Sequence, residues 1–130
     1  MFNKTYLSIG SNIGDRIENI DNSIKLLKTY NSKVIKISSY YDTEPLYYKN
    51  QSHFINIVLL LNTQLLLIDL FICIKKIEVK LGRNLKQKRN HKRVIDIDIL
   101  TYNNNIMNND HLTVPHPRIK ERKFVLLPWN

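Results

Sequence analysis

The chain has 130 residues, of which 43% are hydrophobic and 24% are charged, with only three glycines and four prolines. This length and composition fit one compact domain spanning residues 1–130, and no glycine-, serine- or proline-rich tract offers a linker that would divide it. The formal net charge of +9 indicates an anionic partner. Charge alone does not choose among a nucleotide, a nucleic acid and a membrane surface.

Cysteine content and hydropathy bear on where the protein works. Cys73 is the only cysteine, so an intrachain disulfide is excluded and a reducing cytoplasm is expected. The segment 1–5 lacks the layout of a signal peptide, and the apolar runs 57–61 and 65–68 are far too short to span a bilayer. We therefore expect a cytoplasmic protein that does not enter a membrane.

The first half of the chain reads as strand, helix, strand and loop. Residues 5–9 alternate between apolar and polar side chains up to Gly10, which predicts a strand that ends in a tight turn. Apolar residues at helical spacing after Asp15 predict a helix over 15–29. Alternation returns over 33–41 and predicts a second strand, and residues 43–52 read as a long loop.

The second half reads as strand, helix, basic loop and strand. Residues 54–62 predict a third strand, and 65–81 predict a helix that ends at Gly82. A basic loop leads to a fourth strand over 94–102, after which the chain turns at 103–105 and its prolines predict an irregular tail. The order βαββαβ predicts an α+β, ferredoxin-like fold, in which a four-stranded antiparallel sheet carries two helices on one face.

Asp96 and Asp98 form the most informative pattern of the chain, two carboxylates inside the apolar run 94–100. Residues i and i+2 of a strand point to the same face, with Cα atoms roughly 7 Å apart. Such a pair needs compensation, either from neighbouring arginine and lysine side chains or from hard divalent metal ions. A solvent-facing strand with the isoleucines packed on its other face is the simpler alternative. In either case the pair is expected on the sheet face that the helices leave open.

A basic segment precedes this pair. A run of this kind is usually a solvated loop, because like charges repel and nothing in it can form a core. Placed before two carboxylates, it also has the parts needed to hold a magnesium-bound polyphosphate. Its members are Arg83, Lys86, Lys88, Arg89, His91, Lys92 and Arg93.

Six separated segments occur in an order that resembles one enzyme family. They are Ser8-Ile9-Gly10-Ser11-Asn12, Tyr41-Asp42-Thr43-Glu44-Pro45, Phe54-Ile55-Asn56, Ile77-Glu78 with Leu81-Gly82-Arg83, Arg93 to Ile99, and Leu112 to Phe124 with Pro115-His116-Pro117. Together they resemble the 6-hydroxymethyl-7,8-dihydropterin pyrophosphokinase family of folate biosynthesis. The resemblance runs from residue 5 to about residue 128, and its strength lies in the combination of the six segments.

The resemblance implies transfer of the pyrophosphoryl unit of ATP to the hydroxymethyl group of the reduced pterin, with AMP as the other product. It implies two magnesium ions held by Asp96 and Asp98, with Arg83 and Arg93 also serving catalysis. For Glu78 a plain surface glutamate is the alternative. The ATP-binding residues that it implies are Glu78, Arg83, Arg89, Arg93, Ile99, Thr113, His116 and Arg122.

A flat pterin ring with polar edges requires aromatic stacking and fixed hydrogen-bonding groups. The resemblance assigns stacking to Phe54 and Phe124, for which ordinary core packing is the alternative. Asn56, in a strongly apolar strand, is expected to hydrogen-bond, since a buried amide needs partners. The implied pterin-binding residues are Asn12, Thr43, Glu44, Leu46, Phe54, Asn56, Asp96 and Phe124.

The sequence also departs from the family pattern. Asn90 stands where relatives usually have a tryptophan, Leu85 replaces a common arginine, Tyr47 replaces a frequent glycine and His111 takes a position that is often basic. The C-terminal tail is shorter than in most relatives, which predicts lower stability.

Three hypotheses remain open. The leading one is a monomeric, magnesium- and ATP-dependent pterin pyrophosphokinase, a transferase with no nucleic-acid partner. The second is a ferredoxin-like RNA-binding module, supported by the net charge and an open sheet face but opposed by the aspartates on that face. The third is a decayed enzyme that binds both substrates without turnover.

Overall fold

Strand β1 lies at the centre of the sheet, with an antiparallel partner on each side. The computed structural model describes residues 2–43, 53–82, 94–108 and 112–115. Within them, β1 (Asn3–Ser11) pairs with β4 (Phe54–Thr63) along its whole length. On its other side it pairs with β5 (Asp96–Tyr102). Residues 5–10 of β1 therefore have a cross-strand neighbour in each direction.

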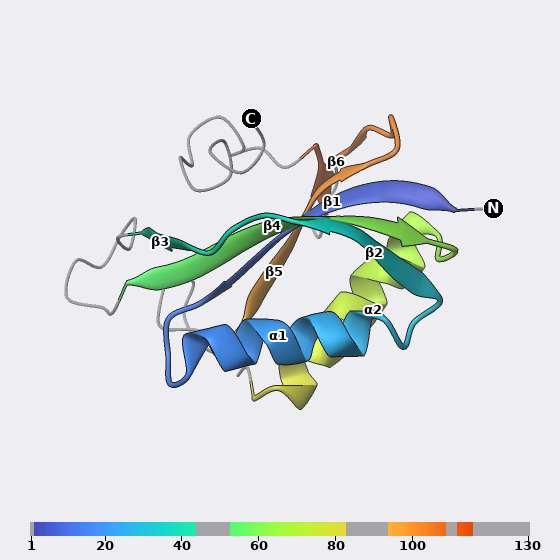
Figure 1. The fold of residues 1–130 in the computed structure, drawn as a ribbon. Coiled ribbons are helices and arrows are strands. Elements are labelled where there is room, and N and C mark those ends of the chain that lie inside the picture. The colour runs from blue at the N-terminus through green and yellow to red at the C-terminus, as the bar shows by residue number, and fades with distance from the viewer. Residues whose placement is uncertain (1, 44–52, 83–93, 109–111, 116–130) are drawn as a thin grey trace.

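The edge of the sheet beyond β4 is formed by two short strands, β2 (Ser32–Ile37) and β3 (Tyr41–Thr43). Both pair antiparallel with β4. The resulting order, β2-β4-β1-β5, with β3 beside β4, is the predicted ferredoxin-like arrangement (Figure 1). The prediction of the fold class is confirmed.

The single strand predicted over 33–41 is wrong in one respect, because it is interrupted. At Ser38 the main-chain N–H donates to the Val58 carbonyl, and the Val58 N–H donates to the Ser38 hydroxyl oxygen, each at 2.9 Å. A side-chain oxygen thus takes the place of a main-chain acceptor, and the chain leaves the regular ladder until Tyr41. An alternating sequence gives no sign of this substitution.

Helices α1 (Arg16–Leu27) and α2 (Leu67–Lys80) both lie on one side of the sheet (Figure 1). The two helices predicted over 15–29 and 65–81 are confirmed within two residues at each end. The Asp15 carboxylate accepts a hydrogen bond from the Glu18 N–H at 3.0 Å and so caps the start of α1. Neither helix is long and apolar enough to cross a membrane, and the same holds throughout the described ranges.

The hydrophobic core lies between the helices and the sheet. Every described element of the βαββαβ plan except β2 and β3 contributes fully or almost fully buried side chains to it. Its members include Leu7 and Ile9 of β1, Ile20 and Leu27 of α1, Ile57 and Leu59 of β4, Leu70 and Ile74 of α2, and Ile97 and Ile99 of β5.

A short hairpin beyond β5 was not predicted. Strands β6 (Met107–Asn108) and β7 (Thr113–Val114) pair antiparallel, where the sequence predicted an irregular tail. Val114 is buried in the main core, so the hairpin is part of the packed domain. Two-residue strands are too short to produce a recognisable alternation, which is why the pattern missed them.

The segment between β2 and β3 is tied to α1. The Tyr40 hydroxyl donates to the Asp21 carboxylate at 2.5 Å. This hydrogen bond, followed by burial and the negative charge of Asp21, raises the pKa of Tyr40 to about 12. The contribution of the Tyr40–Asp21 hydrogen bond to the free energy of unfolding is complete below the ordinary phenol pKa. It is lost as the pH rises through about 12.

Two isoleucines of α2 provide a test of this packing. Ile74 is 1% exposed and Ile72 is 45% exposed. We expect Ile74→Ala to lower the free energy of unfolding by about 2–5 kcal/mol, because it leaves a cavity in the core. Ile72→Ala, the matched control on the same helix, is expected to cost well under half as much. Urea denaturation of both variants measures the difference, and equal losses would contradict the described core.

Candidate active site

The alternation of β5 separates apolar from acidic side chains. Ile95, Ile97 and Ile99 are buried, and Ile97 and Ile99 lie in the core beneath the helices. Asp96 and Asp98 are half-buried and, by the alternation of a strand, share the opposite face. The prediction that the two carboxylates lie on the open face of the sheet is confirmed.

The register of the sheet places small residues of β1 beside both aspartates. Gly10 is paired with Asp96 of β5, and on its other side with Asn56 of β4. One step along, Ser8 is paired with Asp98 and with Val58. Two short rows therefore cross the open face, each with an aspartate at one end and a small residue in the middle.

Gly10 permits a close approach that any larger residue would prevent. A Cβ atom on Gly10 would overlap the side-chain oxygen of Asn56 and would lie 3.5 Å from the Phe54 ring. The side chains of Asn56 and Phe54 thus lie over Gly10, on the face that carries Asp96. Asn56 is 3% exposed and Phe54 is half-buried. Residues that the sequence assigned to pterin and to metal accordingly meet around one glycine.

The turn after β1 is held by a side chain of α1. The Asn19 amide nitrogen donates to the Ser11 hydroxyl at 3.2 Å and to the Ile13 carbonyl at 2.9 Å. Asn12, between these two, is 2% exposed. It lies one residue beyond the Ser11–Ile55 pair and so at the level of Phe54. Asn12, predicted to bind the pterin, therefore lies at the end of the open face.

Glu78 is fully buried, so the alternative of a plain surface glutamate is wrong. One carboxylate oxygen accepts a hydrogen bond from the Ile97 N–H at 2.9 Å, and the other is 3.1 Å from the Lys75 ammonium. Ile97 lies between the two aspartates on β5, which is an edge strand of the main sheet. Glu78 therefore satisfies an edge N–H of this strand and fixes its main chain between Asp96 and Asp98.

Two of these contributors were not assigned from the sequence. The need for Gly10 depends on the approach of Asn56 from another strand, which no local pattern reveals. Lys75 and Glu78 are three residues apart on one helix, a spacing that brings their side chains together. The Lys75 Nζ also lies 5.3 Å from the centre of the Phe71 ring. This spacing was the available signal for Lys75.

The remaining predicted site residues fall into two groups. Thr43 ends β3 opposite Phe54, Thr113 lies in β7, and the Ile99 side chain is in the core, which leaves only its main chain for contact with a nucleotide. The others lie outside the described residues. These are Glu44, Leu46, Arg83, Arg89, Arg93, His116, Arg122 and Phe124.

The donor set fits a metal ion that takes most of its ligands from elsewhere. Across the described ranges no group of three or more His, Cys, Asp or Glu side chains could enclose a metal ion. Two neighbouring carboxylates supply hard oxygen ligands, and Mg²⁺ is commonly held by one or two carboxylates together with phosphate oxygens and water. Asp96 and Asp98 therefore suit magnesium that arrives with a nucleotide better than an all-protein metal cage.

The fold and site define the class of protein. It is a ferredoxin-like domain whose open sheet face combines an acidic pair with a buried amide and an aromatic ring. The family model for 7,8-dihydro-6-hydroxymethylpterin-pyrophosphokinase (HPPK) matches residues 6–130. The chain belongs to this family, as the resemblance of its motifs predicted.

Relatives of this family differ greatly in length. The chain is 44% identical over 126 residues to the folic acid synthesis protein FOL1 of Dictyostelium discoideum, covering 97% of this chain but 19% of that protein. It is 39% identical over 129 residues to the 2-amino-4-hydroxy-6-hydroxymethyldihydropteridine pyrophosphokinase of Bacillus subtilis, covering 98% of this chain and 77% of that protein. Thus the chain spans about a fifth of the first relative and about three quarters of the second.

A solved HPPK-DHPS structure in complex with substrates has the same fold. It superposes with a TM-score of 0.71 at 17% identity, covering 98% of this chain and 39% of that one. At this identity the likeness bears on the fold alone, and it agrees with the strand order described above.

Glu78 can be tested by changing its acceptor. Glu78→Ala leaves the Ile97 N–H buried without an acceptor, which we expect to cost about 1–3 kcal/mol of unfolding free energy. Glu78→Gln retains one acceptor oxygen and is expected to lose less. Urea denaturation measures both, with Glu18→Ala as a control at an exposed glutamate of α1. A loss in Glu78→Ala no larger than in the control would refute the anchoring role.

Proposed function

We propose that the chain transfers the β,γ-pyrophosphoryl group of ATP to the hydroxymethyl oxygen of 6-hydroxymethyl-7,8-dihydropterin. The observation that carries this proposal is the meeting of Asp96, Asn56 and Phe54 around Gly10 on the open face. A carboxylate for metal-bound phosphate lies there beside an amide and a ring suited to a flat heterocycle. Family membership supports the same reaction.

The proposed reaction balances as a single displacement. The pterin hydroxyl oxygen forms a bond to the β-phosphorus of ATP, and the bond from that phosphorus to the oxygen bridging it to the α-phosphorus breaks. AMP leaves with the bridging oxygen, and the hydroxyl proton passes to solvent. The pterin diphosphate is the second product.

Catalysis of this kind needs positioning and charge neutralisation more than covalent chemistry from the protein. Two magnesium ions, when bound, would neutralise phosphate charge and lower the cost of deprotonating the pterin hydroxyl. The chain's own contribution is to hold Asp96 and Asp98 in one orientation, through the pairing of β5 with β1 and the contact of Glu78 with the Ile97 N–H. Asn56 and Phe54 orient the pterin over Gly10.

The other predicted site residues complete this proposal. Arg83 and Arg93 serve catalysis and, with Arg89, Ile99, Thr113, His116 and Arg122, bind ATP. Glu78, predicted as an ATP-binding residue, is fully buried and acts on the ATP site through the β5 main chain that it holds. Asn12, Thr43, Glu44, Leu46, Asp96 and Phe124 join Phe54 and Asn56 at the pterin. We further propose that the chain works as one domain and as a cytoplasmic monomer without a nucleic-acid partner.

AMP formation tests the proposed function directly. Purified protein is incubated with ATP, magnesium and the reduced pterin, and AMP is followed by chromatography. We expect pterin-dependent AMP, and its absence from a folded sample would refute the proposal.

Removing both aspartates gives the corresponding negative control. We expect Asp96→Ala with Asp98→Ala to lower kcat by at least about a thousandfold, since several kcal/mol of transition-state stabilisation are lost. Omission of magnesium from the wild-type assay is expected to have a similar effect. Substantial activity in the double variant would show that the carboxylates do not hold the metal.

Gly10→Ala tests the close approach around the proposed pterin site. The new methyl group displaces the Asn56 amide, so we expect the KM for pterin to rise about tenfold or more while the KM for ATP changes little. Adding Asn56→Ala removes the overlap, because the remaining contact with Phe54 is an ordinary 3.5 Å. This double variant is expected to recover thermal stability but not pterin affinity. Unchanged pterin KM in Gly10→Ala would contradict the proposed location.

A further inference from the structure

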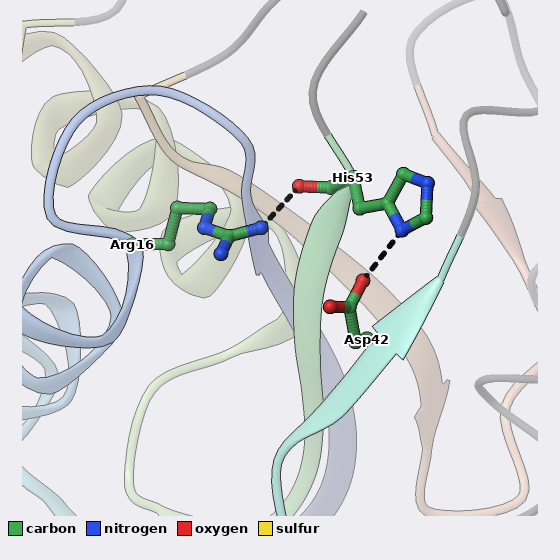
Figure 2. A network of polar contacts seen from close by, with 3 residues as sticks. All are labelled: Arg16, Asp42 and His53. Carbon is green, nitrogen blue, oxygen red and sulfur yellow. Dashed lines mark hydrogen bonds and ion pairs between the residues drawn. The ribbon is translucent and has the colours of Figure 1, made fainter.

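Three polar residues from different elements meet beside β3. Arg16 begins α1, Asp42 is the middle residue of β3, and His53 directly precedes β4 (Figure 2). The Arg16 guanidinium donates to the His53 carbonyl at 2.8 Å, and His53 Nδ1 lies 3.0 Å from the Asp42 carboxylate. We call these three residues the β3 clamp.

The clamp lies on the back of the strands that carry the proposed pterin site. Asp42 is paired with Ile55, and His53 precedes Ile55 by two residues, so all three share one face of the sheet. Ile55 belongs to the helix-side core. Phe54 and Asn56, the residues on either side of Ile55 in β4, point to the open face by the same alternation. The clamp therefore supports the pterin side of the strands without being able to touch a pterin there.

Strand β3 needs such support because it is short. It has three residues and, in the part of the chain that the structure describes, one partner strand, β4. Ladders this short are marginal on their own. Cross-strand side-chain pairs are the contacts that stabilise such a ladder. The Asp42–His53 pair is a diagonal contact of this type, and it bridges the point where β3 ends and β4 begins.

Arg16 connects this ladder to α1. The same part of α1 carries Asn19, which holds the Ser11–Ile13 turn. Side chains of one helix end thus fix two neighbouring parts of the open face, the turn after β1 and the start of β4. Both parts border Phe54, through the Ser11–Ile55 pair on one side and through His53 on the other.

We propose that Arg16, Asp42 and His53 are positioning residues that align Phe54 with Asn56 for the pterin, and so set pterin affinity from behind the sheet. This inference rests on the proposed function. The Asp42 and His53 side chains are 56% and 52% exposed, and exposed pairs of this kind contribute little to global stability. Their effect is therefore local and can be separated from folding.

The test separates contact from charge by paired substitutions. Asp42→Ala, His53→Ala and Arg16→Ala remove the contacts. Asp42→Asn keeps an acceptor oxygen, and His53→Asn places an amide N–H close to the position of Nδ1. Ser32→Ala is the matched control, since it removes a cross-strand contact of 2.7 Å to Thr63 at the far end of the same edge.

Steady-state kinetics and amide exchange give independent readouts. We expect each alanine variant to raise the KM for pterin about three- to tenfold, with kcat and the KM for ATP within twofold of wild type. The asparagine variants are expected to restore the wild-type pterin KM, and Ser32→Ala to leave it unchanged. Amide exchange of Thr43 and Ile55 is expected to accelerate in Asp42→Ala but not in Asp42→Asn.

The possible failures are distinguishable. If the wild-type chain turns over pterin and the alanine variants keep its pterin KM, the inference is wrong and the proposed function stands. Equal changes in the KM for both substrates, or no rescue by asparagine, would also overturn the positioning role. If the wild-type chain binds no pterin, the proposed function fails and this inference fails with it, whatever the exchange data show.

Discussion

The antiparallel pairing of β1 with both β4 and β5 is the constraint on which the rest of the structure depends. Because side chains alternate along each strand, the register of the pairing determines both which side chains enter the core and which lie on the open face. With Gly10 opposite both Asn56 and Asp96, the isoleucines of β5 enter the core and its aspartates emerge together. A slip of one residue in β5 would turn its two aspartates toward the core and its two isoleucines, Ile97 and Ile99, away from it, so the fold and the site have the same requirement.

Two polar contacts reinforce this register from positions outside the open face. Glu78 accepts from the Ile97 N–H at the edge of β5, and Arg16 donates to the His53 carbonyl at the start of β4. Each comes from a helix and each ends on the main chain of a strand that carries site residues. The helices thus cover the core and also fix the positions of β4 and β5 on either side of β1.

Local patterns predicted much of this from the sequence. The alternation of isoleucine and aspartate over 95–99 sufficed to place Asp96 and Asp98 on the open face, and the Asp15 and Gly82 signals bounded the helices. Other features depend on distant partners. The break at Ser38 arises from a hydrogen bond to Val58, and the burial of Glu78 from an N–H nineteen residues away. The β6–β7 hairpin was too short for any periodicity to appear.

The burial of Glu78 also shapes the electric field of the molecule. Three carboxylates, those of Glu78, Asp96 and Asp98, converge on one stretch of β5, and Lys75 is the cation seen beside Glu78 within the described residues. The chain as a whole carries a net charge of +9. A net positive charge of this size favours the approach of a polyanion to the protein, whereas the carboxylates of β5 favour the approach of a cation. A metal-bound nucleotide, the substrate form in the proposed reaction, carries both kinds of charge and so meets both preferences of the chain.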